Sequence, residues 1–413
     1  MSRSWDMTSS KSADVVVVGG GTVGAWTAVQ LAERGAGRVV LLEARTLGDG
    51  ASSRASGMVR AQGGTETAIR LGLRSQAFYA ASGGRYPLDC GFVAQGYLMP
   101  CFTEAEVAQA HERIALQHRL GLTVEWLSSS GIDSRGTGMT PGVTLGGSYA
   151  PGDGYIDAPR NVLAYTAALF TAGVRVIERT AFTGLVVEGD RVTGVRTSAA
   201  EIATSRVVLT GGPSLAAVGA AAGVRIPSGG ARHQVVVTES HPDFAPERLP
   251  MVFDVASGIY WRPCEGGVMW GMSNPEEQPG EATEFDGAYY ARMNERMARL
   301  LPTTAKVGLR KTWAATIDFT PDHLPILGPA LGPDGVLEGT VVAAAGGHGM
   351  MWGPGVARAA ADLALEGATD VLDVSDLGLD RFDEHGRSRL VPDPIALPFP
   401  ESADPAVVDA PGR

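Results

Sequence analysis

The sequence predicts an α/β chain, α+β overall, in which a parallel-sheet domain is joined to a second, mainly antiparallel-sheet domain. Three observations predict this class. A β-branched run over 14–18 leads into a glycine-rich turn and a helical pattern, as in a β-α-β unit. The same order of strand, glycine turn and helix recurs over 341–362. Between these segments, short runs with strand character are separated by turns, which is typical of an antiparallel sheet.

Composition limits the classes of function. The chain has 413 residues, 44% hydrophobic and 19% charged, enough for two or three compact units. The formal net charge of −11 disfavours nucleic acid as a partner. Cys90, Cys101 and Cys264 show no C-x-x-C spacing, so we expect no disulfide framework, no metal site and a reducing cytoplasm. We find no signal-peptide pattern and no apolar run of eighteen residues, and therefore expect no membrane span.

The elements follow in order. After the strand at 14–18 we expect a helix over 25–34, a strand over 39–42 and a Gly/Ser-rich loop over 44–64. N-terminal capping patterns then predict helices beginning near Thr103 and Asp157. The remaining predictions are strands at 174–177, 206–210, 233–238, 258–262, 267–271 and 341–345, a hairpin over 185–197, and helices over 284–301 and from about 354.

Both domains are predicted to be discontinuous, because parallel-type and antiparallel-type segments alternate along the chain. The parallel-sheet domain takes 13–90, 150–225 and 310–385. The antiparallel-sheet domain takes 91–149 and 226–309. Residues 386–413 are rich in proline and are predicted to form an extended tail.

The first β-α-β unit carries the strongest chemical signal. Its G-x-G-x-x-G motif is Gly19, Gly21 and Gly24, which permit a tight turn, a close approach of a pyrophosphate and close helix packing. Glu43 ends the second strand, where a carboxylate accepts hydrogen bonds from ribose hydroxyls and disfavours a 2′-phosphate. The sequence therefore predicts a Rossmann-like domain that binds an adenine dinucleotide. One β-α-β unit followed by a long loop, with parallel strands resuming only after residue 150, favours FAD over NAD.

The chain resembles the D-amino-acid oxidase superfamily of FAD-dependent oxidoreductases, nearest the sarcosine oxidase β-subunit and glycine oxidase branch. Four segments carry the resemblance: VVVVGGGTVG with LLEA, GASSRASGMVRAQ, GVRTSAAEIATSRVVLTGG, and TPDHLPILGP followed by GGHGMMWGPG. They lie in the family's order and span about 14–385. The resemblance implies an FAD-binding domain on the parallel sheet and a substrate-binding domain on the antiparallel sheet.

The resemblance also implies which residues meet FAD. The pyrophosphate, ribose, flavin loop, adenine and isoalloxazine contacts would come from Gly19, Gly21, Thr22, Val23, Gly24, Glu43, Ala44, Arg45, Ser52, Ser53, Gly57, Met58, Phe182, Gly211, Gly212, Gly347, His348, Gly349 and Met350.

Three positions depart from the family pattern. Ile317 stands where many glycine-oxidase relatives have an arginine that clamps a substrate carboxylate. Ala315 stands where monomeric sarcosine oxidases have the cysteine that tethers FAD, and no histidine occurs in 44–64, so we expect noncovalent FAD. Met269 stands where those oxidases have an oxygen-activating lysine, which leaves room for a dehydrogenase.

Four residues are candidates for catalysis or substrate binding. His348 lies in a glycine-rich loop and would either tune the flavin or hold the loop. Arg60 and Arg262 could each clamp a carboxylate, and we favour Arg262 because it lies on a predicted strand. Tyr260 lies two residues from Arg262 and so on the same strand face.

These features predict an FAD-dependent amine or amino-acid oxidase or dehydrogenase. It would oxidise a C–N bond of an amino acid or of a secondary or tertiary amine by hydride transfer to flavin N5. One alternative is a 2-hydroxy acid dehydrogenase that uses His348 as base. Another is a non-catalytic FAD-binding subunit of a larger complex. We expect a small-molecule partner, with a homo-oligomer or an electron-acceptor protein also open.

Overall fold

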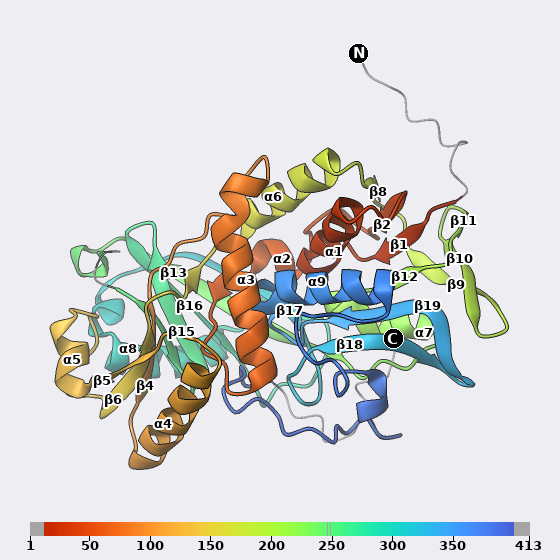
Figure 1. Ribbon diagram of the computed structural model, residues 1–413. Coiled ribbons are helices and arrows are strands. Elements are labelled where there is room, and N and C mark those ends of the chain that lie inside the picture. The colour runs from red at the N-terminus through yellow and green to blue at the C-terminus, as the bar shows by residue number, and fades with distance from the viewer. Residues whose placement is uncertain (1–11, 246, 248, 400–413) are drawn as a thin grey trace.

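Two large sheets organise the protein. The computed structural model describes residues 12–245, 247 and 249–399. In Figure 1 the nine-stranded sheet lies at the right and the eight-stranded sheet at the left. The first sheet comprises β1 (Val15–Val18), β2 (Val39–Leu42), β8 (Arg175–Ile177), β9 (Phe182–Glu188), β10 (Arg191–Thr197), β11 (Glu201–Ala203), β12 (Val207–Leu209), β18 (Ile326–Gly332) and β19 (Gly335–Ala344).

The second sheet is antiparallel except where β14 pairs in parallel with β4. Its strands are β4 (Tyr97–Cys101), β5 (Glu125–Ser128), β6 (Gly146–Ala150), β13 (Gly229–Thr238), β14 (Met251–Asp254), β15 (Ile259–Cys264), β16 (Gly267–Ser273) and β17 (Leu309–Phe319). A third ladder joins β3 (Met58–Val59) to β7 (Gly154–Tyr155). The mixed α/β class agrees with the sequence analysis, as does the presence of one sheet with a parallel core and a second, mainly antiparallel sheet.

The helices are distributed over both sheets. They are α1 (Thr22–Glu33), α2 (Ala51–Arg54), α3 (Glu66–Arg85), α4 (Glu104–Arg119), α5 (Ser129–Ser134), α6 (Ala158–Thr171), α7 (Leu215–Ala221), α8 (Gly287–Leu300) and α9 (Gly349–Glu366). Thr103 and Asp157 cap α4 and α6 as predicted, by accepting hydrogen bonds from the N–H groups of Glu106 and Arg160. No helix among the described residues has the length and apolar character needed to cross a membrane.

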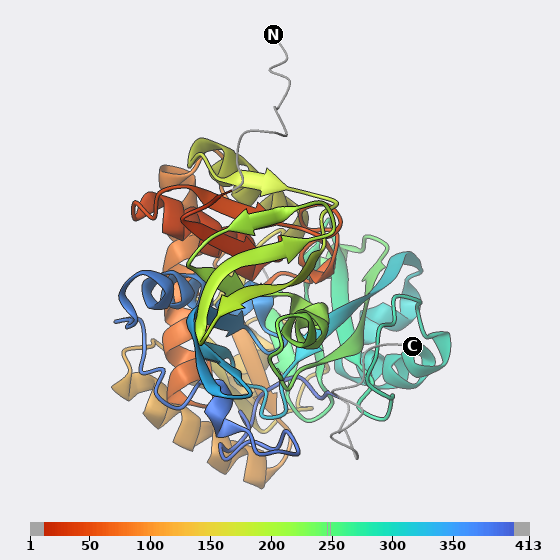
Figure 2. The same ribbon diagram turned by 90° about the vertical axis from the view of Figure 1, so that its right-hand side faces the viewer.

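The parallel core of the first sheet runs in the order β19-β12-β1-β2-β8, and its strands β12, β1 and β2 are buried throughout. Val15 and Val17 of β1 pack into a cluster with α1, α3, α6 and α9. Val16 and Val18 face the opposite way, against α7 and the antiparallel strands β9 to β11. Figure 2 shows these antiparallel strands, in yellow-green, as a separate layer in front of the parallel strands. The continuous β-branched sequence of β1 follows from burial on both faces.

Helix α9 begins five residues earlier than predicted and carries Pro354 inside it. The predicted start was wrong, because a proline inside a helix leaves one carbonyl without its donor, a cost that a proline in the first turn avoids. Here the carbonyl of Met350, which Pro354 leaves without a helical donor, accepts a hydrogen bond from the hydroxyl of Tyr79 at 2.9 Å. Tyr79 lies on α3, a helix that was not predicted from the sequence.

Two boundaries differ from the predicted domain division. β17, placed in the parallel-sheet domain with 310–385, is instead the edge strand of the eight-stranded sheet, where it pairs antiparallel with β13. The sequence pattern typical of a parallel strand, on which the assignment of 310–385 rested, begins only at β19. Residues 386–399 contain no helix or strand, yet Ile395 and Phe399 are buried, so this part of the proline-rich segment is packed against the protein. Residues 400–413 lie outside the described residues.

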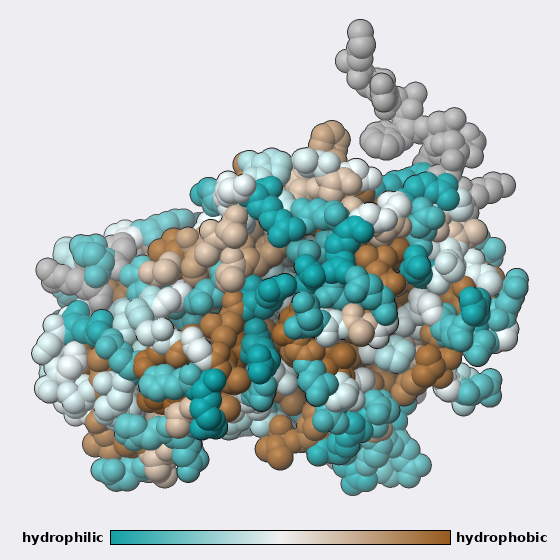
Figure 3. All heavy atoms as spheres, viewed as in Figure 1, coloured by the Kyte–Doolittle hydropathy of each residue, from teal (hydrophilic) through white to brown (hydrophobic). Residues whose placement is uncertain are grey.

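The surface seen in Figure 3 is of mixed polarity. Apolar side chains lie in separate groups between polar ones across that face. Leu163 and Phe170 on α6 are 59% and 82% exposed. Scattered apolar side chains of this kind are normal on a globular protein.

Candidate active site

A cavity of about 1040 Å³ lies between the two large sheets. It is lined by the turns that follow β1, β2, β12 and β19, at the carboxyl ends of neighbouring parallel strands. This edge is where open α/β sheets bind their ligands. The opposite wall comes from β13, β15 and β17 of the second sheet.

The turn after β1 is shaped by its glycines. Gly19 has φ +98°, and a Cβ on Gly24 would collide with the carbonyl oxygen of Gly19. Gly21 is the N-cap of α1 and has no side chain that could accept a hydrogen bond from the first N–H groups of the helix. Such a helix start, with its partial positive charge, is suited to a pyrophosphate.

Glu43 is fixed at the end of β2. One carboxylate oxygen accepts a hydrogen bond from the N–H of Gly20 at 2.7 Å, and the other accepts one from the N–H of Arg45 at 2.8 Å. The carboxylate therefore holds two turns together and faces the cavity beside the start of α1. Each carboxylate oxygen can accept further hydrogen bonds, as a ribose contact requires.

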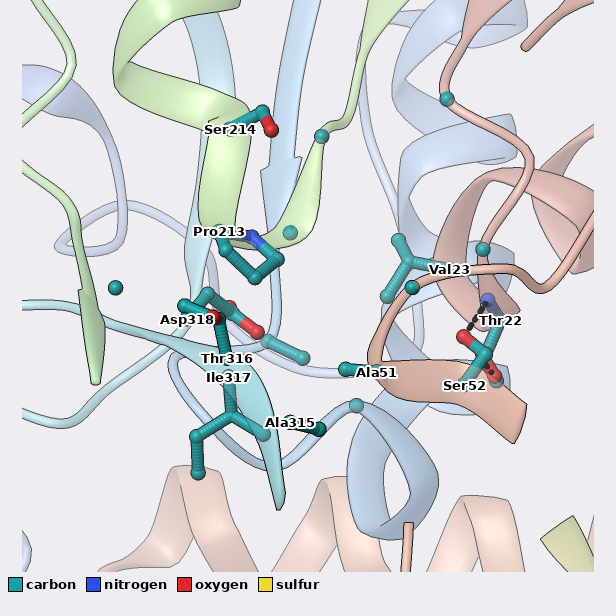
Figure 4. A pocket seen from close by; sticks show the side chains of 18 of the residues that line it. Thr22, Val23, Ala51, Ser52, Pro213, Ser214, Ala315, Thr316, Ile317 and Asp318 are labelled. Atoms are coloured by element: carbon teal, nitrogen blue, oxygen red, sulfur yellow. Dashed lines mark hydrogen bonds between the residues drawn. The ribbon is translucent and has the colours of Figure 1, made fainter. Parts of the chain in front are cut away.

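The loop after β2 folds over the start of α1. The hydroxyl of Ser52 on α2 accepts a hydrogen bond from the N–H of Thr22 at 2.9 Å. Figure 4 shows Thr22, Val23 and Ser52 on one side of the cavity and residues 315–318 of β17 on the other. The N–H of the Trp313 indole donates to the carbonyl of Arg54 at 2.8 Å, which joins this loop to β17.

Arg262 does not line the cavity, contrary to our preference for it as the carboxylate clamp. Its Nε donates to the carbonyl of Ser56 at 2.8 Å, and Nη1 donates to the carbonyl of Pro263 at 3.0 Å. The guanidinium also lies 4.4 Å from the ring centroid of Tyr155. Strand position placed Arg262 on the correct face, but its long side chain reaches the loop after α2 and supports it.

Arg60 lines the cavity and is 3% exposed. It donates to the backbone carbonyls of Gln62 and Ile395, the second at 2.8 Å. Its guanidinium lies 5.5 Å from the ring centroid of Phe253. Among the described residues, no carboxylate forms an ion pair with it, although its charge opposes the rise that burial causes in the pKa of Asp153 and Asp393. A buried cation without a paired anion, at the wall of a cavity, is suited to an anionic ligand.

A polar pair lies on the second-sheet side of the cavity. Nε2 of His233 is 2.5 Å from the hydroxyl of Tyr260, and Nδ1 is 2.7 Å from the hydroxyl of Ser273. Both His233 and Tyr260 line the cavity. Burial lowers the pKa of His233 to about 4 and raises that of Tyr260. Gly271 on the paired strand leaves the space in which Tyr260 lies.

His348 is the N-cap residue of α9 and is 3% exposed. Its Nδ1 lies 3.0 Å from the carbonyl of Gly346 and must donate to it, because a carbonyl only accepts. Nε2 is then an acceptor, and it has no hydrogen-bond partner among the described residues. Burial, and then the charge of Arg60, lower the pKa of His348 to about 3, so the ring is neutral at physiological pH.

Asp318 supports the turn before His348. Its carboxylate accepts a hydrogen bond from the N–H of Gly347 at 3.3 Å, and burial raises its pKa. Gly346 and Gly347 have φ of +56° and +87°, the left-handed region that favours glycine. The backbone conformation of this turn therefore favours two consecutive glycines whether or not a ligand binds.

The structure brings nearly all the predicted site residues to one cavity. Ser53 and Arg262 are the exceptions, since neither lines it. His233 lies at the site without having been singled out in the sequence. The predicted residues that line the cavity are Gly19, Gly21, Thr22, Val23, Gly24, Glu43, Ala44, Arg45, Ser52, Gly57, Met58, Arg60, Phe182, Gly211, Gly212, Tyr260, Gly347, His348, Gly349 and Met350.

The residues present fit FAD. The glycine turn at the start of α1 has room for a pyrophosphate, Glu43 can meet a ribose, and the cavity continues from there to the second sheet. The FAD-dependent oxidoreductase model named DAO matches residues 14–363 of this sequence. The chain belongs to this family of FAD-dependent oxidoreductases. The DAO match takes in both large sheets, so the assignment of the parallel sheet as the FAD-binding domain, with a second domain beside it, agrees with the family fold.

Named relatives and solved structures of the DAO family are similar over most of this chain. The 4-methylaminobutanoate oxidase (formaldehyde-forming) of Paenarthrobacter nicotinovorans is 27% identical over 91% of this chain, and glycine oxidase of Geobacillus kaustophilus is 28% identical over 76%. The structure of L-proline dehydrogenase from P. horikoshii has a TM-score of 0.83 at 26% identity, covering 92% of this chain and 100% of that one.

This chain spans less than half of several curated relatives. It covers 46% of the 4-methylaminobutanoate oxidase and 84% of the glycine oxidase.

The described part of the chain holds no group of three or more His, Cys, Asp or Glu side chains that could bind a metal ion.

Proposed function

We propose that this chain is a noncovalent FAD enzyme that oxidises the C–N bond of an amino acid or of a secondary or tertiary amine carrying a carboxylate. The observation that carries this proposal is Arg60, a buried guanidinium without a paired carboxylate among the described residues, on the wall of the family's cofactor cavity. The names of similar proteins, an oxidase of a methylated amino acid and a glycine oxidase, support the substrate class.

Arg60 takes the role of carboxylate anchor in this proposal. Ile317 cannot supply it, and Arg262 is held by backbone carbonyls away from the cavity. The guanidinium of Arg60 is oriented by the carbonyls of Gln62 and Ile395, and it presents its remaining N–H groups without first breaking an ion pair. A fixed planar donor suits a carboxylate and orients the bond to be oxidised.

Bound FAD would supply the hydride acceptor, its N5 atom. The chain's own residues would then exclude water and keep the substrate amine uncharged. His348, at the start of α9, is neutral, and its Nε2 atom is a hydrogen-bond acceptor. On the opposite sheet, the hydroxyl of Tyr260 is held by its hydrogen bond with His233. The Nε2 acceptor of His348 can take a hydrogen bond from the N–H of an amine that binds in its uncharged form.

A 2-hydroxy acid dehydrogenase is less well supported by the same geometry. That chemistry needs a base for a hydroxyl proton, and a histidine whose pKa is near 3 is a weak base. The buried, unpaired Arg60 is consistent with a substrate site and gives no support to a non-catalytic subunit. We further propose a reducing, cytoplasmic setting, consistent with three cysteines that are all free thiols.

The deciding experiment is an anaerobic screen of the purified FAD-loaded protein. We expect carboxylate-bearing amines, such as N-methylated amino acids, to bleach the long-wavelength flavin band, and the corresponding hydroxy acids to leave it unchanged. Bleaching by hydroxy acids alone would favour the dehydrogenase alternative. A flavin spectrum that none of these compounds alters would favour a non-catalytic subunit. Electron acceptors, including O2, are then compared on the reduced protein.

A further inference from the structure

Residues 393–399 run along the substrate end of the cavity, although the chain reaches them only after both domains are complete. We call this segment the C-terminal strap. Leu397 lines the cavity, whereas Asp393, Ile395 and Phe399 are buried. None of these residues belongs to a helix or strand, so side-chain packing and a few hydrogen bonds hold the strap in place.

The strap touches both halves of the molecule. Phe399 stacks on Phe319 of β17, with ring centroids 5.4 Å apart, and on His323, at 5.3 Å. A Cβ on Gly347 would lie 2.5 Å from the ring of Phe399, so the strap covers the turn before α9. Pro398 packs equally closely on Gly258, between β14 and β15 of the second sheet.

The strap also contacts the proposed substrate anchor. The carbonyl of Ile395 accepts a hydrogen bond from Nη2 of Arg60 at 2.8 Å. The carboxylate of Asp393 is turned back on the strap, where it accepts a hydrogen bond from the N–H of Ile395 at 3.1 Å. Arg60 is therefore oriented by the neutral carbonyl of Ile395, and Asp393 interacts with its charge without an ion pair.

The chemistry of the wall follows from these contacts. Leu397 offers an apolar surface on the same cavity as the Arg60 guanidinium and the ring of Phe253. A ligand that fits both features has a carboxylate at one end and an apolar group that reaches Leu397.

We propose that the strap is the specificity-determining wall of the substrate site, and that Leu397 limits the size of the apolar group on a carboxylate-bearing substrate. This inference rests on the proposed function, because it assumes that Arg60 anchors the carboxylate. Leu397 acts by contact with the apolar group, and Ile395 acts through Arg60 as a positioning residue.

The test uses the full FAD-loaded chain and three unreactive carboxylates, acetate, butyrate and hexanoate, titrated while the visible flavin spectrum is recorded. In Leu397→Ala we expect hexanoate to bind at least about tenfold more tightly relative to acetate than in the wild type. In Leu397→Trp we expect butyrate to bind at least about tenfold more weakly relative to acetate. A tenfold change corresponds to about 1.4 kcal/mol.

Leu390→Ala is the matched control. Leu390 is also half-buried and packs on the same core cluster, but it does not line the cavity. It should keep the wild-type order of affinities, and all variants should keep the wild-type ratio of flavin to protein. The inference is overturned if both Leu397 variants keep the wild-type order, if Leu390→Ala changes it equally, or if no carboxylate perturbs the wild-type spectrum.

Failure of this inference differs from failure of the proposed function. If amines bleach the wild-type flavin while the Leu397 variants bind carboxylates as the wild type does, only the inference about the strap fails. If no amine bleaches the flavin, the proposed reaction fails whatever the carboxylate titrations show.

Discussion

At the scale of single residues, two arginines with similar sequence arguments have different surroundings. Arg262 donates hydrogen bonds to the carbonyls of Ser56 and Pro263 and does not line the cavity. Arg60 lines the cavity with no ion-pair partner among the described residues. Long side chains can reach several places from one backbone position, so the sequence could nominate both arginines, and its preference for Arg262 rested on strand position alone.

We expect Arg60→Met to lower kcat/KM with a carboxylate-bearing amine by at least about a hundredfold. A desolvated Arg–carboxylate pair, once broken, costs about 3–5 kcal/mol. FAD content should be near normal. Arg262→Met should reduce kcat/KM much less and lower the melting temperature instead, because Arg262 supports a loop. Near-native kcat/KM in Arg60→Met, measured by steady-state kinetics, would contradict the anchor assignment.

Glu43→Arg should purify with little FAD. The change removes a carboxylate expected to accept from ribose, places a cation there, and frees the N–H groups of Gly20 and Arg45. The loss of two charge-assisted bonds suggests about 3–6 kcal/mol weaker binding. Glu188→Arg, an exposed change on β9, is the control. The flavin-to-protein absorbance ratio measures the effect, and full loading of Glu43→Arg would refute it.

His233 should make stability depend on pH in the acid range. Its folded pKa of about 4 lies below the unfolded value near 6.5, so the unfolded chain binds the proton more readily. Its contribution is present above pH 6.5 and is lost as pH falls towards 4. Between pH 6.5 and 4, the free energy of unfolding should fall by about 3 kcal/mol more in the wild type than in His233→Asn. Urea unfolding of both proteins measures the difference.

His385→Asn is the control for that titration, because His385 is exposed. It should follow the wild-type pH profile. Identical profiles for the wild type and His233→Asn would mean that His233 titrates normally in the folded protein. The sequence analysis missed His233 because its partners, Tyr260 and Ser273, lie on other strands, and only strand pairing brings the three side chains together.

At the scale of elements, local signals predicted most of what surrounds the cofactor cavity. The β-branched run of β1, the glycines at the start of α1 and the N-caps of α4 and α6 each act within a few residues. The structure has β1, α4 and α6 where the sequence predicted them, whereas α1 begins at Thr22, three residues before the predicted helix. The start of α9 could not be predicted in this way. Its Pro354 is accommodated by Tyr79, which lies far away in the sequence on α3.

Tyr79→Phe should therefore destabilise the protein by about 1–3 kcal/mol. The ring remains, but the buried carbonyl of Met350 loses its donor next to Pro354. Tyr290→Phe is the control, because no hydrogen bond of its hydroxyl is found among the described residues. Urea unfolding of both variants, compared at constant m-value, gives the difference. Equal stability of the two variants would mean that Tyr79 does not replace the missing helical bond.

At the scale of the whole molecule, the cavity depends on two sheets built from segments that alternate along the chain. Strand type predicted that there are two sheets, but it placed β17 in the wrong one, because a single edge strand carries little sign of its partner. The position of the strap was still harder to predict from the sequence. Proline-rich sequence predicted an extended tail, and nothing local indicates that Leu397 reaches the cavity.

FAD spanning this cavity would contact both sheets, so its binding should stabilise the entire fold. Ala315 removes one covalent attachment point, and the flavin loop lacks histidine, so acid precipitation should release all the yellow colour into the supernatant. Because the ligand binds only the folded state, a free FAD concentration a hundred times its Kd should add about 2.7 kcal/mol to the free energy of unfolding. The melting temperature of deflavinated protein should accordingly rise with added FAD and not with riboflavin, which lacks the pyrophosphate and ribose that α1 and Glu43 are suited to bind. Colour that stays in the acid pellet would show a covalent bond, and an equal response to riboflavin would place the binding energy at the flavin ring alone.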